Sequence, residues 1–178
     1  MENKMTKRKS SFLYRSKKFY AIISSEIRGG NNFSSNGWAI YTDRKYATPQ
    51  WIGENFRRAL HTSDDMNEHL QYHPEDREGI TEKSNQAFYD FWEKIVEDFQ
   101  IKDWRTAVIR TARVFSSWDY ENTDQIELTA TRGSGGGHGA WDLDKNDGKV
   151  FHVSIHDTDE AIGEAVLKAF DACKPNYA

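Results

Sequence analysis

The sequence of 178 residues predicts an α+β fold: a single domain with a mainly antiparallel sheet and packed helices. The main observation is a repeat. Segments 48–60 and 158–170 share Thr, Ile-Gly-Glu, a basic residue and Ala at equal offsets. Each copy follows a strand-like segment and has the apolar spacing of a short amphipathic helix. We therefore expect two equivalent β-then-helix units.

Strand-like segments make up much of the remaining chain. Runs rich in β-branched and aromatic residues, several of them alternating, predict strands. These runs are 19–26, 38–42, 106–118, 125–131 and 150–155. Turn-forming residues at 28–37 and a glycine-rich loop at 132–139 separate some of these runs.

The helix boundaries are predicted from capping residues. Thr48 is a suitable N-cap for the first repeat helix, with Pro49 at its first position. Asp157, with Glu160 three residues later, predicts a capping box for the second. A third helix, 85–99, has the widest apolar stripe, which predicts that it is the most buried, with Ser84 or Asn85 as its cap. The polar segment 62–82 is expected to be an exposed connection with at most a short helix.

Gly53 and Gly163 occupy the same place in the two repeats. A glycine inside a helix costs about 1 kcal/mol relative to alanine. Its recurrence at matched positions predicts that the helix backbone lies close against the sheet or another helix there.

Charge and composition suggest a cytoplasmic protein. The net charge is −4, Cys173 is the single cysteine, and no apolar run is long enough to span a bilayer. The basic start has no apolar segment of the signal-peptide kind. We expect residues 1–18 to form a basic, flexible arm and residues 19–178 to form the domain.

No catalytic or cofactor site is expected. The loop 132–139 lacks the Gly-Lys-Ser/Thr ending of a phosphate loop. Asp65, His69 and His73 have helical spacing, but Pro74 disfavours helical geometry at His73, so no metal site is predicted. One alternative is an enzyme acting on nucleic acid through Arg132, His138 and the basic arm. Another is a nucleic-acid-binding module based on the arm.

The sequence as a whole resembles the immunity proteins of bacterial contact-dependent growth inhibition systems. The resembling pieces are 19–23, the first Ile-Gly-Glu helix, 112–115, 126–132 and, above all, 153–170. The resemblance implies a non-enzymatic antidote that acts inside the cell. Its partner would be a cognate toxin domain, a basic nuclease, and direct binding to nucleic acid or membrane is not expected.

The toxin-binding surface is expected on the acidic connection, because a nuclease concentrates positive charge to hold its substrate. The carboxylates of this connection are Asp64, Asp65, Glu68, Glu75, Asp76 and Glu78. Trp141 and Asp142, beside the glycine-rich loop, form an alternative rim, since an exposed aromatic side chain can anchor an interface.

Overall fold

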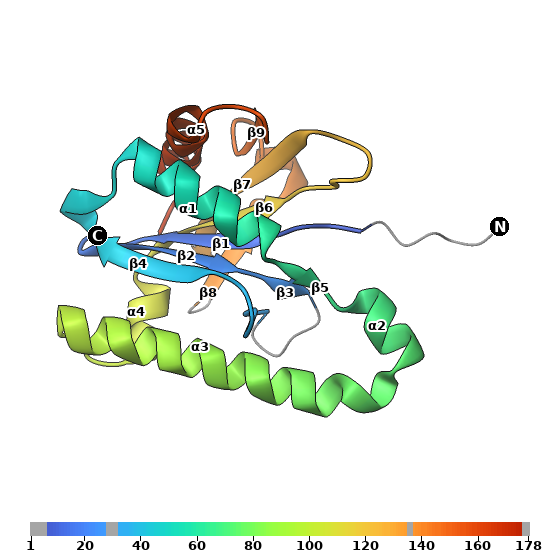
Figure 1. The fold of residues 1–178 in the computed structure, drawn as a ribbon. Helices are drawn as coiled ribbons and strands as arrows, with labels where there is room; N and C mark the ends of the chain where they lie inside the picture. Colours follow the sequence, from blue (N-terminus) through green and yellow to red (C-terminus); the bar gives the residue numbers. More distant parts are fainter. Residues whose placement is uncertain (1–6, 28–31, 135–136, 176–178) are drawn as a thin grey trace.

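The computed structural model describes residues 7–27, 32–134 and 137–175. It confirms an α+β domain with a mostly antiparallel sheet and packed helices (Figure 1). The strands of the main sheet are β1 (Ser11–Arg15), β2 (Phe19–Ser24), β4 (Ala39–Asp43), β6 (Ala112–Ser117), β7 (Gln125–Ser134), β8 (Gly137–Ala140) and β9 (Val150–Ser154). Their order is β4-β2-β1-β6-β7-β8, and β9 also pairs with β7.

The sheet consists of two similar halves. Strands β1, β2 and β4 form an antiparallel meander followed by helix α1 (Pro49–His61), and β6, β7 and β9 form another followed by α5 (Asp159–Asp171). The halves join through antiparallel pairing of β1 with β6. An approximate two-fold axis through the β1–β6 pair therefore relates the two halves of the sheet. The two β-then-helix units expected from the repeat are therefore present.

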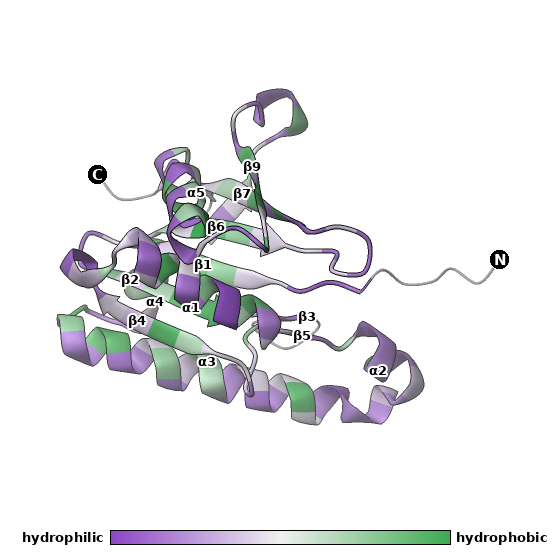
Figure 2. Cartoon of the chain, turned by 45° about the horizontal axis from the view of Figure 1, so that its top comes forward, coloured by the Kyte–Doolittle hydropathy of each residue, from purple (hydrophilic) through white to green (hydrophobic). Residues whose placement is uncertain are grey.

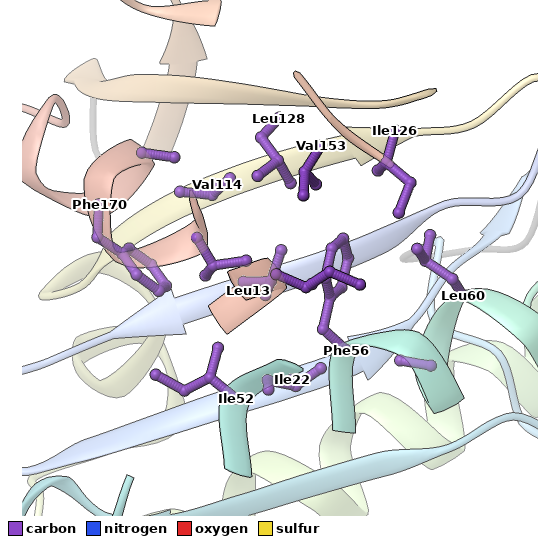
Figure 3. Packing of buried hydrophobic residues seen from close by; sticks show 14 of the residues in the cluster. Leu13, Ile22, Ile52, Phe56, Leu60, Val114, Ile126, Leu128, Val153 and Phe170 are labelled. Carbon is purple, nitrogen blue, oxygen red and sulfur yellow. The ribbon is translucent and has the colours of Figure 1, made fainter. Parts of the chain in front are cut away.

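Helices cover the sheet on both faces (Figure 1). Helices α1 and α5 pack on one face, and α3 (Arg77–Phe99) and α4 (Trp104–Ile109) on the other. Figure 2 shows hydrophobic residues along the strands between these layers. The cluster under α1 and α5 includes Phe56 and Phe170 of these helices and Leu13 and Leu128 of the sheet (Figure 3). The second cluster is aromatic, with Trp92 of α3 fully buried against Tyr14 and Phe19.

Short elements connect the main ones. Strands β3 (Glu26–Ile27) and β5 (Asp64–Asp65) form a small parallel pair. Helix α2 (Asn67–Tyr72) lies beyond the sheet, near the start of α3 (Figure 1). Short 3-10 helices are η1 (Arg44–Tyr46), η2 (Pro74–Asp76) and η3 (Leu143–Lys145).

The two repeat helices begin in the same way. The Thr48 hydroxyl accepts a hydrogen bond from the Trp51 N–H at 3.2 Å, which confirms the predicted cap. In the second helix the cap is Thr158, which accepts from the Ala161 N–H at 3.2 Å. The predicted capping box at Asp157 is therefore wrong. Asp157 precedes the cap, and its carboxylate accepts from the Ser154 N–H instead.

Helix α3 differs from its prediction in extent and burial. It begins at Arg77, so 77–82 is helical and Ser84 lies inside the helix, buried, rather than at its cap. Nor is α3 the most buried helix: it buries four of 23 residues, whereas α1 buries six of 13. The physical reason is that one face of α3 packs on the sheet while the rest faces solvent.

Two boundaries are also corrected. The predicted strand 106–118 is a strand only at β6, because Asp103 caps helix α4 by accepting from the Thr106 N–H at 2.7 Å. The predicted arm, 1–18, contains β1, which lies between β2 and β6 in the sheet and buries Ser11 and Leu13. The flanking basic residues obscured this short apolar run, 12–14. The part of the arm at 1–6 lies outside the described residues.

The glycine-rich loop joins two strands, as expected. Strand β7 continues to Ser134, and β8 returns antiparallel to it from Gly137. Positions 135–136 of the predicted loop lie outside the described residues. Most of the predicted loop is therefore strand.

Candidate functional site

The predicted acidic residues follow one another along β5, α2, η2 and the first turn of α3. Figure 2 shows that α2 is mostly hydrophilic, and Figure 1 places it at one end of the molecule. Glu68, Glu75, Asp76 and Glu78 are exposed, and Asp64 and Asp65 are half-buried. The fold thus gathers the carboxylates into one region, which we call the acidic end.

Side chains of Lys7, His69 and His73 contact three of the exposed carboxylates of the acidic end. Glu68 forms an ion pair with Lys7 at 3.3 Å, and its hydrogen bond and charge raise the pKa of Lys7. The Asp76 carboxylate lies 2.7 Å from the His69 ring, and Glu75 lies 3.4 Å from His73. Such exposed pairs contribute little to stability. Their carboxylates remain accessible to a partner of opposite charge.

The half-buried carboxylates have local structural partners. Asp64 accepts a hydrogen bond from the Ser34 hydroxyl at 3.2 Å, and Asp65 accepts from the Asn67 N–H at 3.0 Å. These bonds hold β5 and the start of α2. The accessible part of the acidic end therefore consists mainly of the four exposed carboxylates.

Glu26 is an additional carboxylate of this region that sequence reasoning missed. It is 4% exposed, pairs across β3–β5 with Asp64, and has a buried Oε1 atom without a hydrogen-bond partner. Burial, and then the charge of Asp64, raise its pKa to about 7. The sequence signal was weak, because Glu26 ends a run of apolar and small residues that reads as an ordinary strand.

The alternative rim lies between β8 and β9. Lys149 lies over the Trp141 ring, with its Nζ 4.5 Å from the ring centroid. Asp142 is 3.6 Å from both Arg132 and Lys145. Next to them Leu143 is 90% exposed, an unusual environment for a large apolar side chain. The rim follows β8 and precedes β9, whereas the acidic end lies on β5, α2, η2 and the start of α3, so the two regions belong to different elements.

The residues of the enzyme alternative have packing roles. His138 Nε2 lies 3.0 Å from the Thr111 carbonyl oxygen and 3.1 Å from its hydroxyl, and burial lowers the pKa of this histidine. This contact ties β8 to the chain between α4 and β6. Arg132 pairs with Asp142. These two residues do not form an acid–base pair around an open cavity.

The described part of the chain holds neither a metal-binding cluster nor a membrane-spanning helix. Within it, no group of three or more His, Cys, Asp or Glu side chains is arranged to hold a metal ion. No helix in the described ranges has both the length and the hydrophobicity required to cross a bilayer.

The fold is shared with solved structures. A chain of the CdiA-CT/CdiI toxin and immunity complex from Yersinia pseudotuberculosis matches with a TM-score of 0.71 and 14% identity, over 94% of this chain and 98% of that one. A protein of unknown function from Neisseria meningitidis matches with a TM-score of 0.69 and 15% identity, over 98% of this chain and 100% of that one. At these identities the likeness shows the fold. No curated protein sequence matches the chain.

The family is established by the sequence. The family model of CDI immunity proteins matches residues 9–173. The chain therefore belongs to the CDI immunity protein family, which confirms the resemblance seen in the sequence. The match includes both repeat helices and all strands of the main sheet.

Proposed function

We propose that this protein binds the cognate toxin domain of a contact-dependent growth inhibition system and neutralises it in the cytoplasm. The observation that carries the proposal is the family match over residues 9–173. A fold shared with a chain of a toxin and immunity complex supports it. Neutralisation by binding requires a matched surface and no chemistry of its own, which agrees with the packing roles of His138 and Arg132.

We further propose that the toxin is a nuclease and that the acidic end contacts it. A nuclease needs a positively charged groove to hold RNA or DNA, and exposed carboxylates complement such a groove. Glu68, Glu75, Asp76 and Glu78 supply that charge on one end of the molecule. Trp141 and Asp142, with the exposed Leu143, are the alternative contact surface.

Co-expression with the toxin domain encoded immediately upstream tests the proposed function. We expect a stable complex in size-exclusion chromatography and normal growth of cells that the toxin alone would kill. Adding the pure protein to toxin and nucleic acid should also stop cleavage. A lethal toxin that forms no complex with this chain would show the proposal to be wrong.

A separate control addresses the enzyme and nucleic-acid-binding alternatives. The pure protein is incubated with RNA and with DNA, with and without divalent metal ions. We expect neither cleavage nor salt-sensitive binding. Metal-dependent cleavage that is lost in His138→Ala would favour the enzyme instead.

A further inference from the structure

Arg113, on β6, lies among three aromatic rings. The central carbon of its guanidinium is 4.2 Å from the ring centroid of Phe12, 4.9 Å from that of Phe115 and 5.1 Å from that of Tyr14. Phe12 and Phe115 also contact each other edge-to-face, with centroids 5.9 Å apart. We call these four residues the Arg113 box. Cation–π contacts to three rings fix the guanidinium in place.

The guanidinium of Arg113 has no polar partner in the described part of the chain. It forms no ion pair or hydrogen bond there, and its Nε atom is buried and unpartnered. Arg15 and Arg57, by contrast, pair with Asp171 at 2.9 Å and Asp159 at 2.8 Å. A guanidinium has five donors, and leaving donors without partners in a partly buried site is unfavourable. The protein alone therefore does not satisfy this charge.

The Arg113 box lies at the edge of the aromatic core. Val114 faces α1 and α5, so Arg113 and Phe115 face the opposite side of the sheet. On that side the core formed with α3 and α4 includes side chains of β1, β2 and β4 but none of β6, β7 or β9. Arg113 and Phe115 remain partly exposed. A partner can therefore reach the box from the side of β6 and β7.

We propose that the Arg113 box receives a carboxylate side chain of the toxin domain, which forms an ion pair with the guanidinium. This inference rests on the proposed function and adds a contact separate from the acidic end. A guanidinium binds a carboxylate through two parallel hydrogen bonds, and the surrounding rings strengthen the attraction by excluding water. Arginine is also one of the residue types most enriched among interface hot spots.

The charge around the box favours a protein carboxylate over a nucleic acid. Glu127 is opposite Ser117 in the β6–β7 register and therefore on the same face as Phe115, where it is exposed. The carboxylate of Glu127 and the net charge of −4 for the whole chain both oppose the approach of a run of phosphates. A single carboxylate on a toxin surface can reach Arg113 without meeting that repulsion.

The test compares toxin binding by the wild type with binding by Arg113→Met and Arg113→Lys. Methionine keeps apolar contact with the rings and removes the charge, whereas lysine keeps the charge and loses the planar pair of donors. We expect Arg113→Met to bind about 30-fold more weakly or worse, the loss typical of a broken buried charge pair. We expect Arg113→Lys to bind at least about 10-fold more weakly. Arg58→Met is the matched control, because Arg58 lies over the Trp38 ring at 3.4 Å on another part of the molecule and should not affect binding.

The outcomes separate this inference from the proposed function. If the wild type does not bind the toxin domain, the proposed function fails. If the wild type binds and Arg113→Met binds equally well, the Arg113 inference is wrong although the function stands. Should Arg113→Met fail to fold, Arg113→Lys decides, and wild-type affinity in that variant overturns the inference. Binding of a short single-stranded oligonucleotide by the wild type, lost in Arg113→Met, would assign the box to phosphate and also overturn it.

Discussion

Gly53 of α1 lies directly against the main-chain carbonyl of Asp159, at the start of α5. A side-chain carbon at Gly53 would overlap that carbonyl oxygen, and one at Gly163 would overlap the carbonyl oxygen of Pro49 in the same way. The contact is reciprocal: each helix places its glycine on the first turn of the other. The two repeat helices therefore pack against each other around the approximate two-fold axis of the sheet.

Replacing either glycine should destabilise the protein. In Gly53→Leu and Gly163→Leu the new side chain meets backbone atoms, which cannot turn away as a side chain can. We expect each substitution to lower the free energy of unfolding by about 1–3 kcal/mol. Denaturant unfolding followed by circular dichroism measures this loss.

Gly79 provides the control for that experiment. It also lies in a helix, in the first turn of α3, but a side-chain carbon there meets no atom of another element within 4 Å. Gly79→Ala should therefore stabilise the protein by about 1 kcal/mol through helix propensity alone. If the leucine variants unfold at the same denaturant concentration as the wild type, the close helix–helix contact is not important for stability.

The repeat is where sequence reasoning reached furthest. Two glycines at equal offsets predicted a close backbone contact, because an unfavourable residue recurring in matched surroundings needs a packing reason. The sequence left open whether the neighbour was a sheet or a helix. Helix α1 follows β4 and α5 follows β9, so whether the two helices meet depends on where these strands lie in the sheet. Local sequence patterns do not encode those positions.

Ser84 gives a second prediction. Its hydroxyl donates to the Phe33 carbonyl at 2.8 Å and accepts from the Phe33 N–H at 3.3 Å, and the residue is fully buried. Ser84→Ala removes both bonds and leaves two backbone groups without partners, so we expect a loss of about 1–3 kcal/mol. Thermal and denaturant unfolding measure the change. Gln86→Ala, which removes one exposed bond to Asp90, should change stability by less than about 0.5 kcal/mol, and an equal effect in both would argue against the Ser84 account.

Ser84 also shows why the start of α3 was misplaced. Serine in a polar segment before an apolar stripe is the usual sign of a helix N-cap. Here the hydroxyl bonds to the distant Phe33 instead, and the helix begins seven residues earlier, at Arg77. A tertiary hydrogen bond between segments far apart in sequence has no local signal.

Glu26 predicts a specific pH dependence. Its pKa of about 7 in the folded protein is above the ordinary glutamate value, so the folded state binds its proton more tightly than the unfolded state does. The cost of ionising Glu26 is absent at low pH, grows as pH rises from about 4.5 to 7, and is complete above that range. Stability should therefore fall with rising pH in this window because of Glu26.

Glu26→Gln tests this assignment, because an amide does not ionise. Relative to the wild type, the variant should gain about 1–3 kcal/mol of stability between about pH 5 and pH 8. Unfolding midpoints measured across that range give the difference. A constant difference between the two proteins at every pH would show that Glu26 does not titrate in this window.

The candidate site was predictable only in part. The acidic residues of 64–78 are close together in the sequence, and they also lie in one region of the fold. The ion pair of Glu68 with Lys7 and the raised pKa of Glu26 depend on contacts that bring distant segments side by side. The Arg113 box likewise depends on pairing between distant segments, because β1 and β6 place Phe12 opposite Phe115 although these residues are far apart in the sequence.

The last prediction concerns the acidic end. Reversing the charge of Glu68, Glu75 and Glu78 to lysine should leave the fold intact, because all three side chains are exposed. If a basic toxin meets this surface, the association rate should fall by about tenfold or more, and its dependence on salt should weaken. Stopped-flow or surface-based kinetics at low and physiological ionic strength measure both effects.

Glu54, Glu93 and Glu164 are exposed on other helix surfaces, and their reversal gives a control with the same change in net charge. If both triple variants slow association equally, the effect reflects net charge alone. If neither variant slows association, the interface lies elsewhere, and the rim at Trp141 and Asp142 is the next surface to test.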